Sequence, residues 1–357
     1  GEYPRELRLI LSLEHSRVAF DEIKTWNGYA ETPLYSLKKI ASQLGVKSIY
    51  YKDESSRFGL GSFKALGGTY GVLKFIHHAL KKEIGDEVSM KDIHAGKYSE
   101  QISKYTVTTA TDGNHGRSVA FGAKLFGCKC QIYIHSEVSS GRQKAMEDLE
   151  ATVNRVSGNY DESLQICIED AGKNNWYVIS DTSYEGYTKY PRYIMAGYNV
   201  MAEEIIDQIK DRPLPTHVFL QGGVGSFPGA ICGYFWEKFP GNNIKFVVVE
   251  SEHAPCLIRS AQNNQMTSVN IKQETMMAGL SCGEPSLLGW EILRSGTDDF
   301  ITINDSSIPG LMRLLAKNNL KIEAGESSVA GLAGLIESME DQKIAKAMGL
   351  NKESIVL

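Results

Sequence analysis

The sequence predicts an α/β fold with mainly parallel sheets, and three observations carry this prediction. Short β-branched runs alternate with longer amphipathic stretches along the whole chain, as in strand–helix–strand units. Glycine-rich loops follow several of the strand candidates. The chain has 357 residues, 42 % hydrophobic and 23 % charged, which suits one large folded unit or two smaller domains. Right-handed crossovers between parallel strands would then place helices on both sheet faces.

The individual elements follow from hydrophobic periodicity. The strand candidates are rich in β-branched and aromatic residues, and they are 48–52, 105–109, 129–134, 176–180, 217–220, 245–249 and 299–303. The helix candidates repeat apolar residues at helical spacing, and they are 64–80, 115–126, 141–149, 161–173, 192–209, 227–239, 306–317 and 327–339. Ligands of parallel sheets bind at the carboxyl ends of strands, so the loops that follow the strands are where we expect a site.

Charge and cysteine content exclude several classes of protein. With 38 Lys and Arg against 43 Asp and Glu, the net charge of −5 predicts no general attraction to nucleic acid or to an anionic membrane. The longest uncharged stretch, 213–236, contains three prolines and five glycines, which indicates a buried strand, loop and helix rather than a membrane span. The six cysteines match neither a disulfide scaffold nor a zinc motif, and no other metal motif is recognisable. We expect reduced thiols in a cytoplasmic protein, with a Cys256–Cys282 bridge as the minority outcome.

The stretch 62–68 places Lys64 near a predicted helix start, after the strand 48–52. The partial positive charge of a helix N-terminus and burial both disfavour a protonated amine, so we expect a lowered pKa for Lys64. An amine of that kind is a nucleophile suited to Schiff-base chemistry on a carbonyl cofactor. Taken alone, a surface lysine at a helix start is the commoner explanation.

The stretch 108–116 follows a β-branched run and opens a helix, so its backbone N–H groups could bind a carboxylate. Asp112 would repel such an anion. It is therefore either a helix cap, or a base or partner for a cationic substrate group. The role of His115 is ambiguous in the same way, and a lone histidine is more often structural than catalytic. Asp181 follows the strand 176–180, where active-site groups concentrate, but taken alone an ordinary loop or capping aspartate is the commoner explanation.

The loop 222–226 reads Gly-Gly-Val-Gly-Ser between a strand and a helix, which is typical of a phosphate cradle. A nicotinamide dehydrogenase is the competing interpretation, since the strand 245–249 ends at Glu250. Pro228 stands where the third glycine of the dinucleotide motif belongs, and this disfavours the close packing of helix on strand. A monophosphate site fits better.

Together these stretches carry a resemblance that none of them carries alone. A Ser-Phe-Lys lysine, a Gly-Asn-His-Gly loop and a Gly-Gly-Val-Gly loop, in that order, resemble the fold-type-II pyridoxal-phosphate enzymes. Within them the chain looks like the diaminopropionate ammonia-lyases. The matching segments are 26–29, 32–34, 51–54, 111–117, 185–189, 278–285 and 325–327. Serine and threonine dehydratases of this fold usually carry a small residue in place of Asp112, which favours the ammonia-lyases.

The resemblance implies a particular architecture. It comprises two open, twisted, mainly parallel sheets flanked by helices. A large domain that binds pyridoxal phosphate is formed by residues 1–64 and 175–357, and a small inserted domain by residues 65–174. The resemblance also implies a homodimer that acts on a small amino acid, and closure of the small domain over substrate is a hypothesis. Relatives supply a partner for the pyridine nitrogen from a segment after Leu357, so we name no residue for it.

The resemblance also implies roles for individual residues. Lys64 would hold pyridoxal phosphate as an internal aldimine, Phe63 would pack beside the cofactor, and Asn114 would hydrogen-bond its ring hydroxyl. The phosphate would be bound by Gly222, Gly223, Val224, Gly225 and Ser226. The residues that face the substrate would be Thr111, Asp112, Gly113 and His115.

The implied activity is that of a carbon–nitrogen lyase. It is the α,β-elimination of 2,3-diaminopropionate, as D and L isomers, to pyruvate and two ammonia. The α-protons of the isomers project from opposite faces, so we assign Asp181 to the L isomer and Asp112 to the D isomer. A desolvated aspartate next to another carboxylate should have a raised pKa, which suits a base. The alternatives are a serine or threonine dehydratase and a non-catalytic protein that binds pyridoxal phosphate.

Overall fold

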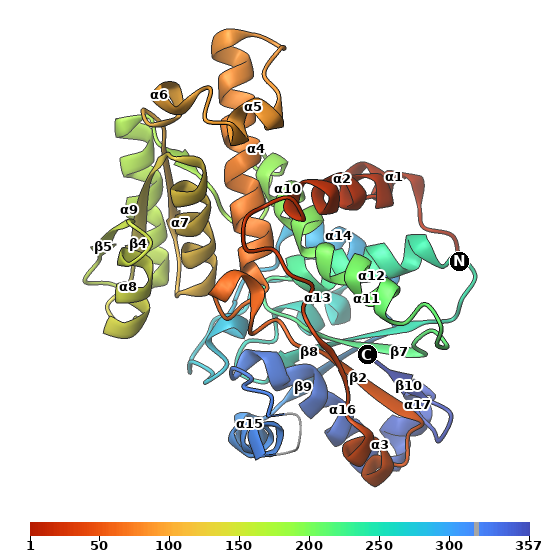
Figure 1. The fold of residues 1–357 in the computed structure, drawn as a ribbon. Coiled ribbons are helices and arrows are strands. Elements are labelled where there is room, and N and C mark those ends of the chain that lie inside the picture. The colour runs from red at the N-terminus through yellow and green to blue at the C-terminus, as the bar shows by residue number, and fades with distance from the viewer. Residues whose placement is uncertain (318–320) are drawn as a thin grey trace.

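The computed structural model describes residues 1–317 and 321–357, and its larger sheet has six strands (Figure 1). In spatial order they are β1 (Leu34–Ser36), β2 (Ser48–Lys52), β10 (Ile355–Val356), β7 (His217–Gln221), β8 (Lys245–Ser251) and β9 (Asp299–Ile303). All neighbours are parallel except β1, which runs antiparallel to β2.

The smaller sheet is wholly parallel, in the order β5 (Thr152–Arg155), β4 (Lys129–Ile134), β3 (Thr106–Ala110) and β6 (Tyr177–Val178). Three helices pack on its strands: α7 (Asn114–Phe126), α8 (Ser140–Glu147) and α9 (Tyr160–Asn174). The α/β prediction with two mainly parallel sheets is confirmed. The division into domains stays a prediction, and β6 lies just beyond the proposed boundary at residue 174.

Helices cover both faces of the large sheet, because its central strands alternate between two cores. Val218 and Val248 belong to one core, whereas Phe219 and Val247 belong to the other. The first face carries α10 (Lys189–Tyr198), α11 (Val200–Gln208), α12 (Ser226–Lys238), α13 (Cys256–Asn263) and α14 (Leu287–Gly296). The second carries α3 (Lys38–Leu44), α15 (Ile308–Lys317), α16 (Ala330–Glu340) and α17 (Gln342–Met348).

The helix α4 (Lys64–Ile84) runs between the two sheets and packs against both α7 and α10 (Figure 1). Two glycines make this close packing possible. A Cβ atom at Gly67 would lie 2.4 Å from Tyr198 Cε1, and one at Gly68 would lie 2.4 Å from Ser118 Oγ. The remaining helices are α1 (Arg5–Ile10), α2 (Leu13–Ile23), α5 (Met90–His94) and α6 (Ser99–Ile102), with short 3-10 turns η1 (Arg57–Gly59), η2 (Ala278–Leu280), η3 (Asp305–Ser307) and η4 (Ser327–Val329).

The strands predicted at 48–52, 129–134 and 299–303 have the observed bounds. The single helix predicted over 192–209 is wrong, because the chain breaks there into α10 and α11. Asn199 lies at the break, fully buried, and its side-chain amide donates to Ser16 Oγ at 2.9 Å.

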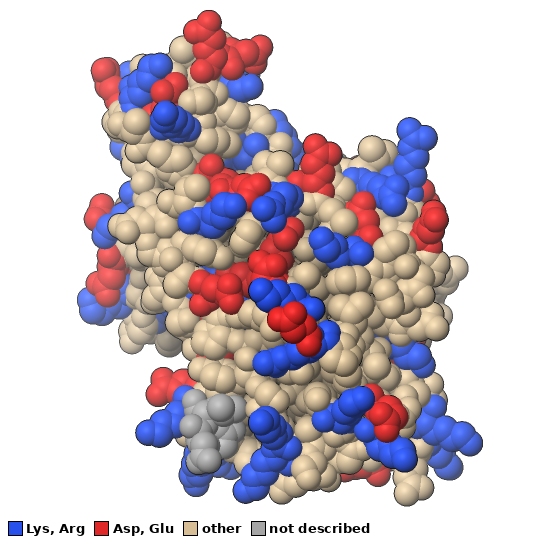
Figure 2. Space-filling view, turned by 45° about the vertical axis from the view of Figure 1, so that its right-hand side comes forward, with Lys and Arg blue, Asp and Glu red and all other residues tan. Residues whose placement is uncertain are grey.

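Positive and negative side chains are interspersed over the face of the molecule in Figure 2, consistent with the near balance of charges in the sequence. Among the described residues, no helix is both long enough and apolar enough to cross a bilayer.

Candidate active site

Four loops bring the predicted site residues to the carboxyl ends of strands. Lys64 is the first residue of α4, and the loop 111–115 joins β3 to α7. Asp181 follows β6, and the loop 222–226 joins β7 to α12. These positions are the usual ligand sites of open parallel sheets, as the sequence predicts.

Lys64 and Asp181 form an ion pair in which Lys64 Nζ donates to Asp181 Oδ2. The side chains are 22 % and 18 % exposed. Burial alone would lower the pKa of Lys64, but the charge and hydrogen bond of Asp181 hold it above its ordinary value. Burial would likewise raise the pKa of Asp181, but Lys64 holds it well below the usual range. The expected directions of both pKa shifts are therefore wrong in this arrangement, because the pair outweighs burial and the helix N-terminus.

Aromatic rings enclose the Lys64 side chain. Its Nζ lies 5.6 Å from the ring centroid of Phe63 and 5.7 Å from that of Tyr198. Phe63 in turn packs edge-on against Tyr198, with centroids 5.0 Å apart, and its ring is tilted against that of Phe227, with centroids 4.7 Å apart. Phe63 thus lies beside Lys64 and belongs to a cluster of aromatic rings next to the amine.

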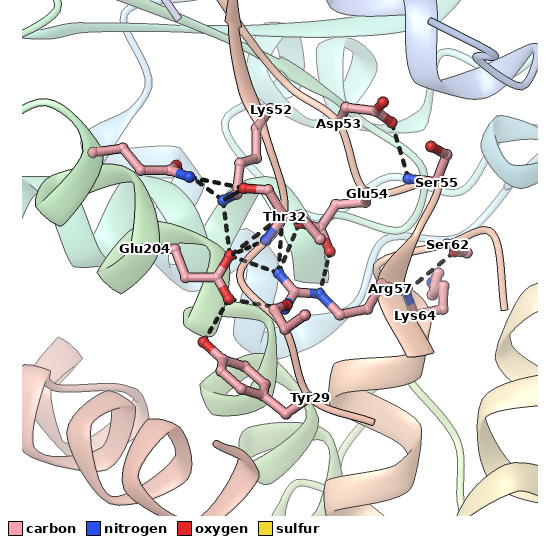
Figure 3. Close-up of polar contacts among 12 residues, drawn as sticks. Tyr29, Thr32, Lys52, Asp53, Glu54, Ser55, Arg57, Ser62, Lys64 and Glu204 are labelled. Atoms are coloured by element: carbon pink, nitrogen blue, oxygen red, sulfur yellow. Dashed lines mark hydrogen bonds and ion pairs between the residues drawn. The ribbon is translucent and has the colours of Figure 1, made fainter. Parts of the chain in front are cut away.

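A buried polar network anchors the segment that leads to Lys64 (Figure 3). The guanidinium of Arg57, 1 % exposed, donates to both carboxylate oxygens of Glu204 at 2.8 Å. It also donates to both oxygens of Glu54, at 2.8 and 2.9 Å. Lys52 Nζ donates to Glu204 Oε2 at 2.7 Å, which ties β2 to α11. Sequence reasoning missed Arg57 and Glu204, although Lys52 and Glu54 of the matching segment 51–54 are their partners.

The loop after β3 is shaped by one hydroxyl. Thr111 Oγ1 accepts hydrogen bonds from the N–H groups of Gly113 and Gly116, both at 3.0 Å. A Cβ at Gly116 would lie 2.3 Å from Thr111 Cγ2, so only glycine fits there. Asn114 begins α7 and is exposed. Two of the N–H groups proposed for anion binding are thus engaged within the loop itself.

His115 reaches from this loop toward Asp181. Its Nε2 donates to the carbonyl oxygen of Ile179 at 2.8 Å. Its Nδ1 is buried, lies 3.8 Å from Asp181 Oδ2 and has no hydrogen-bond partner among the described residues. Burial lowers the pKa of His115. The structure therefore brings His115, Asp181 and Lys64 together around one unpartnered polar atom.

Asp112 lies in the same region but has different partners. Its Oδ1 accepts from His135 Nε2 at 2.7 Å, and its backbone carbonyl accepts from Arg142 Nη1 at 3.4 Å. Burial raises the pKa of Asp112, His135 opposes this rise, and Glu274 adds to it. The expected upward direction is confirmed for Asp112, with burial as the larger cause. Sequence reasoning missed His135.

The loop 222–226 has the form of an anion cradle. Gly223 and Gly225 have positive φ values of 59° and 99°, which favour glycine. Gly225 caps α12 without a side-chain hydrogen bond. In the described part of the chain, the N–H groups of Gly223, Val224 and Ser226 have no hydrogen-bond partner. Free N–H groups at the start of a 13-residue helix suit a phosphate.

Hydrogen bonds tie this cradle to Asp181. The hydroxyl of Ser226 donates to the carbonyl oxygen of Asp181 at 2.7 Å. The N–H of Ser183 donates to Ser286 Oγ at 2.9 Å, and the N–H of Ser286 donates to the carbonyl oxygen of Val224 at 2.7 Å. The carboxylate and the cradle are thus held in a fixed relation.

Glu250, the acid of the dinucleotide interpretation, is used elsewhere. It lies within β8 and accepts from the N–H groups of Leu257 and Ile258, each at 2.8 Å, at the start of α13. Burial raises the pKa of Glu250 to about 7. All six cysteines, Cys256 and Cys282 included, are free thiols in the structure.

The set of donors defines what the site can hold. It offers an amine for a carbonyl group, a cradle of N–H groups for a phosphate, and an unpartnered imidazole nitrogen beside the carboxylate of Asp181. A ligand with both an aldehyde and a phosphate fits these groups.

Comparison with known proteins gives consistent matches. A family model described as pyridoxal-phosphate dependent enzyme matches residues 25–356. The diaminopropionate ammonia-lyase of Escherichia coli (strain K12) is 37 % identical over 338 residues, which cover 92 % of this chain and 83 % of that protein. The crystal structure of that Escherichia coli enzyme with an aminoacrylate-PLP azomethine intermediate has a TM-score of 0.88 at 35 % identity and covers 100 % of this chain and 89 % of that chain. The enzyme's complex with D-serine has a TM-score of 0.87 at 35 % identity, covering 100 % and 90 %.

Proposed function

The chain belongs to the pyridoxal-phosphate dependent enzyme family, and from this premise we propose that it eliminates ammonia from 2,3-diaminopropionate. The resemblance to diaminopropionate ammonia-lyases is confirmed by the 37 % identity over 92 % of the chain. The observation that carries the proposal is the presence of two carboxylates, Asp112 and Asp181, in one site with different partners. A dehydratase acting on a neutral hydroxyl gains nothing from Asp112.

The cofactor is pyridoxal phosphate, and the site residues fit it. Lys64 supplies the amine for its aldehyde, and the N–H groups of the loop 222–226 suit its phosphate. Phe63 would pack beside its ring and Asn114 would reach its hydroxyl. When bound, the cofactor withdraws electrons from the substrate Cα, so that the α-proton becomes acidic and the group on Cβ can leave.

The proton transfers fall to this chain's own side chains. Asp181 Oδ2 and Lys64 Nζ share a hydrogen bond, so a proton taken up by the carboxylate can pass to the amine. His115 Nδ1 borders the same carboxylate. We assign Asp181 to the α-proton of the L isomer and Asp112, on the loop after β3, to that of the D isomer. Pyruvate and two ammonia would be the products.

Charge near Asp112 supports the substrate assignment. The substrate carries a second ammonium group at C3, which serine replaces with a neutral hydroxyl. The carboxylate of Glu274 lies near enough to raise the pKa of Asp112, so the region has two acidic groups. Paired carboxylates attract this second ammonium group and give electrostatic preference over serine. Thr111 and Gly113 would complete the substrate contacts through the loop they shape.

A second candidate is elimination of water from D-serine. It is favoured by one observation, the solved complex of the Escherichia coli relative with D-serine. The two candidates share cofactor and fold, and they differ in the group that leaves Cβ. Pyruvate formation from each compound decides between them.

The test measures pyruvate and ammonia released from D- and L-2,3-diaminopropionate and from D-serine by the purified protein with its cofactor. We expect Asp181→Asn to reduce kcat/KM for the L isomer, and Asp112→Asn that for the D isomer, by about 10²-fold or more. Asp211→Asn is the matched control, because Asp211 is exposed and precedes β7, at the opposite end of that strand. Equal losses for both isomers in each variant would refute the two-base assignment.

A further inference from the structure

We propose that His135 is a positioning residue, which orients Asp112 for proton abstraction from the D isomer. The inference rests on the proposed role of Asp112 as a base. It assigns a function to a side chain that directly follows β4 and that no motif of the sequence singles out.

The register of the small sheet brings the two side chains together. Ala110 of β3 is paired with Tyr133 of β4, and the pairing continues as the N–H of Thr111 donates to the carbonyl oxygen of Tyr133 at 3.0 Å. Asp112 and His135 follow two positions later on each strand, so they leave the sheet side by side. Their contact is therefore built into the parallel pairing of β3 and β4.

Hydrogen bonds fix the role of each imidazole nitrogen. The N–H of Glu137 donates to His135 Nδ1 at 3.3 Å, so Nδ1 is an acceptor. Nε2 therefore carries the proton that is donated to Asp112 Oδ1 at 2.7 Å. Arg155 Nη1 also donates to the carbonyl oxygen of His135 at 3.3 Å, which holds the backbone at this point.

This contact leaves one carboxylate oxygen available. In the part of the chain that the structure describes, Asp112 Oδ1 accepts from His135 and Oδ2 has no hydrogen-bond partner. A carboxylate fixed through one oxygen presents the other in a single direction. Such orientation matters, because a displacement of about 1 Å can reduce a reaction rate about 10²-fold.

His135 also affects the pKa of Asp112, together with the other charged and titratable groups around that carboxyl group. Arg142 lies on α8, Glu274 on the segment between α13 and α14, and Tyr160 at the start of α9. Burial raises the pKa of Asp112, and His135 is the larger of the two groups that lower it, ahead of Arg142. Without His135 the carboxyl group would keep its proton to a higher pH and would be a base over a narrower range.

Each carboxylate in the site thus has its own donor. Lys64 serves Asp181, and His135 serves Asp112. Because the two donors come from separate loops, loss of His135 should lower the activity on the D isomer and leave that on the L isomer unchanged. If the role of His135 were purely structural, its loss would instead lower the activity on both isomers.

The experiment compares His135→Asn with His135→Gln in the cofactor-loaded enzyme. The asparagine oxygen can still accept from the N–H of Glu137, but its amide is too short to reach Asp112. The glutamine amide is long enough to donate to Oδ1. For H135N we expect kcat/KM on the D isomer to fall roughly tenfold to a hundredfold, with the L isomer unchanged. We also expect the acidic limb of the D-isomer pH profile to move to higher pH, and H135Q to restore part of both effects.

Three further variants separate the possible failures. His94→Asn is the matched control, because His94 also contacts a carboxylate, Glu22, at 2.5 Å on the outer surface of α5. In the double variant H135N/D112N, the loss on the D isomer should equal that of D112N alone, since His135 acts through Asp112. If D112N spares the D isomer, the base assignment itself is wrong.

Two outcomes overturn the inference about His135 and leave the base assignment standing. In the first, D112N loses activity on the D isomer while H135N retains it. In the second, H135N lowers kcat/KM equally for both isomers. Far-UV circular dichroism and the cofactor absorbance band of each variant establish that it is folded and loaded. Should H135N fail to fold, H135Q still tests the inference, because the acidic limb of its pH profile, relative to that of the wild type, must then shift more on the D isomer than on the L isomer.

Discussion

Replacement of Glu204 by glutamine should destabilise the protein by about 3 kcal/mol, because it removes the negative charge at the centre of the buried network. Burial alone would raise the pKa of Glu204, but Arg57 and Lys52 lower it from 4.5 to about 2. A difference of about 2.5 pKa units at about 1.4 kcal/mol per unit gives about 3 kcal/mol in favour of the ionised folded state. Removal of one partner of a buried ion pair costs about 3–5 kcal/mol, in agreement.

The assay is equilibrium unfolding in urea, followed by far-UV circular dichroism and tryptophan fluorescence. Asp207→Asn is the matched control, since Asp207 is exposed on the same helix, α11, and loses the same charge. We expect a change within about 0.5 kcal/mol for the control. The folded pKa of Glu204 is lowered, so its contribution is present above pH 4.5 and is lost as the pH falls toward 2. The difference in free energy of unfolding between wild type and E204Q should therefore become smaller at acidic pH. A free energy of unfolding for E204Q equal to that of D207N would refute the reasoning.

Three other predictions follow from features of the packing and of the buried groups. Gly68→Ala places a Cβ 2.4 Å from Ser118 Oγ, so the free energy of unfolding should fall by about 1–3 kcal/mol. A second substitution, Ser118→Gly, should restore part of the lost stability. An unchanged melting temperature for G68A would contradict the close packing of α4. Burial raises the pKa of Glu250 from 4.5 to about 7, so the stability of the wild type relative to Glu250→Gln should fall by up to about 3 kcal/mol as the pH rises from 4.5 through 7. A pH-independent difference in urea unfolding would exclude that shift. Denatured without reductant, the protein should expose six reactive thiols, whereas a count of four would reveal a disulfide.

The sequence predicts the fold class well because long periodic segments report burial directly. Strands such as β4 and β9 have five or more residues rich in β-branched or aromatic side chains, and their bounds are predicted correctly. The strands β1 and β5 have three and four residues, too few to establish a period, and both were missed. The helix break at Asn199 depends on a partner, Ser16, that is distant along the chain.

For the site, composition and order of motifs predict which residues belong together, but not how they interact. Lys64 and Asp181 were both predicted, yet the direction of their pKa shifts was not, because it depends on their direct contact. His135 follows from the register of β3 and β4, which no local pattern specifies. The link between Arg57 and Glu204 likewise joins distant parts of the chain, so only the folded structure reveals it.

The place of β10 in the large sheet has a consequence for the order in which the molecule assembles. Residues 355–356 form the strand between β2 and β7, so they join one side of the sheet to the other. During synthesis on the ribosome these residues emerge after the other strands of the two described sheets, whereas the four strands of the small sheet lie within residues 106–178 and can pair early. Until β10 is synthesised, the edges of β2 and β7 that it joins remain unpaired. Unpaired strand edges promote aggregation, so this is the stage of synthesis at which we expect the chain to need chaperones.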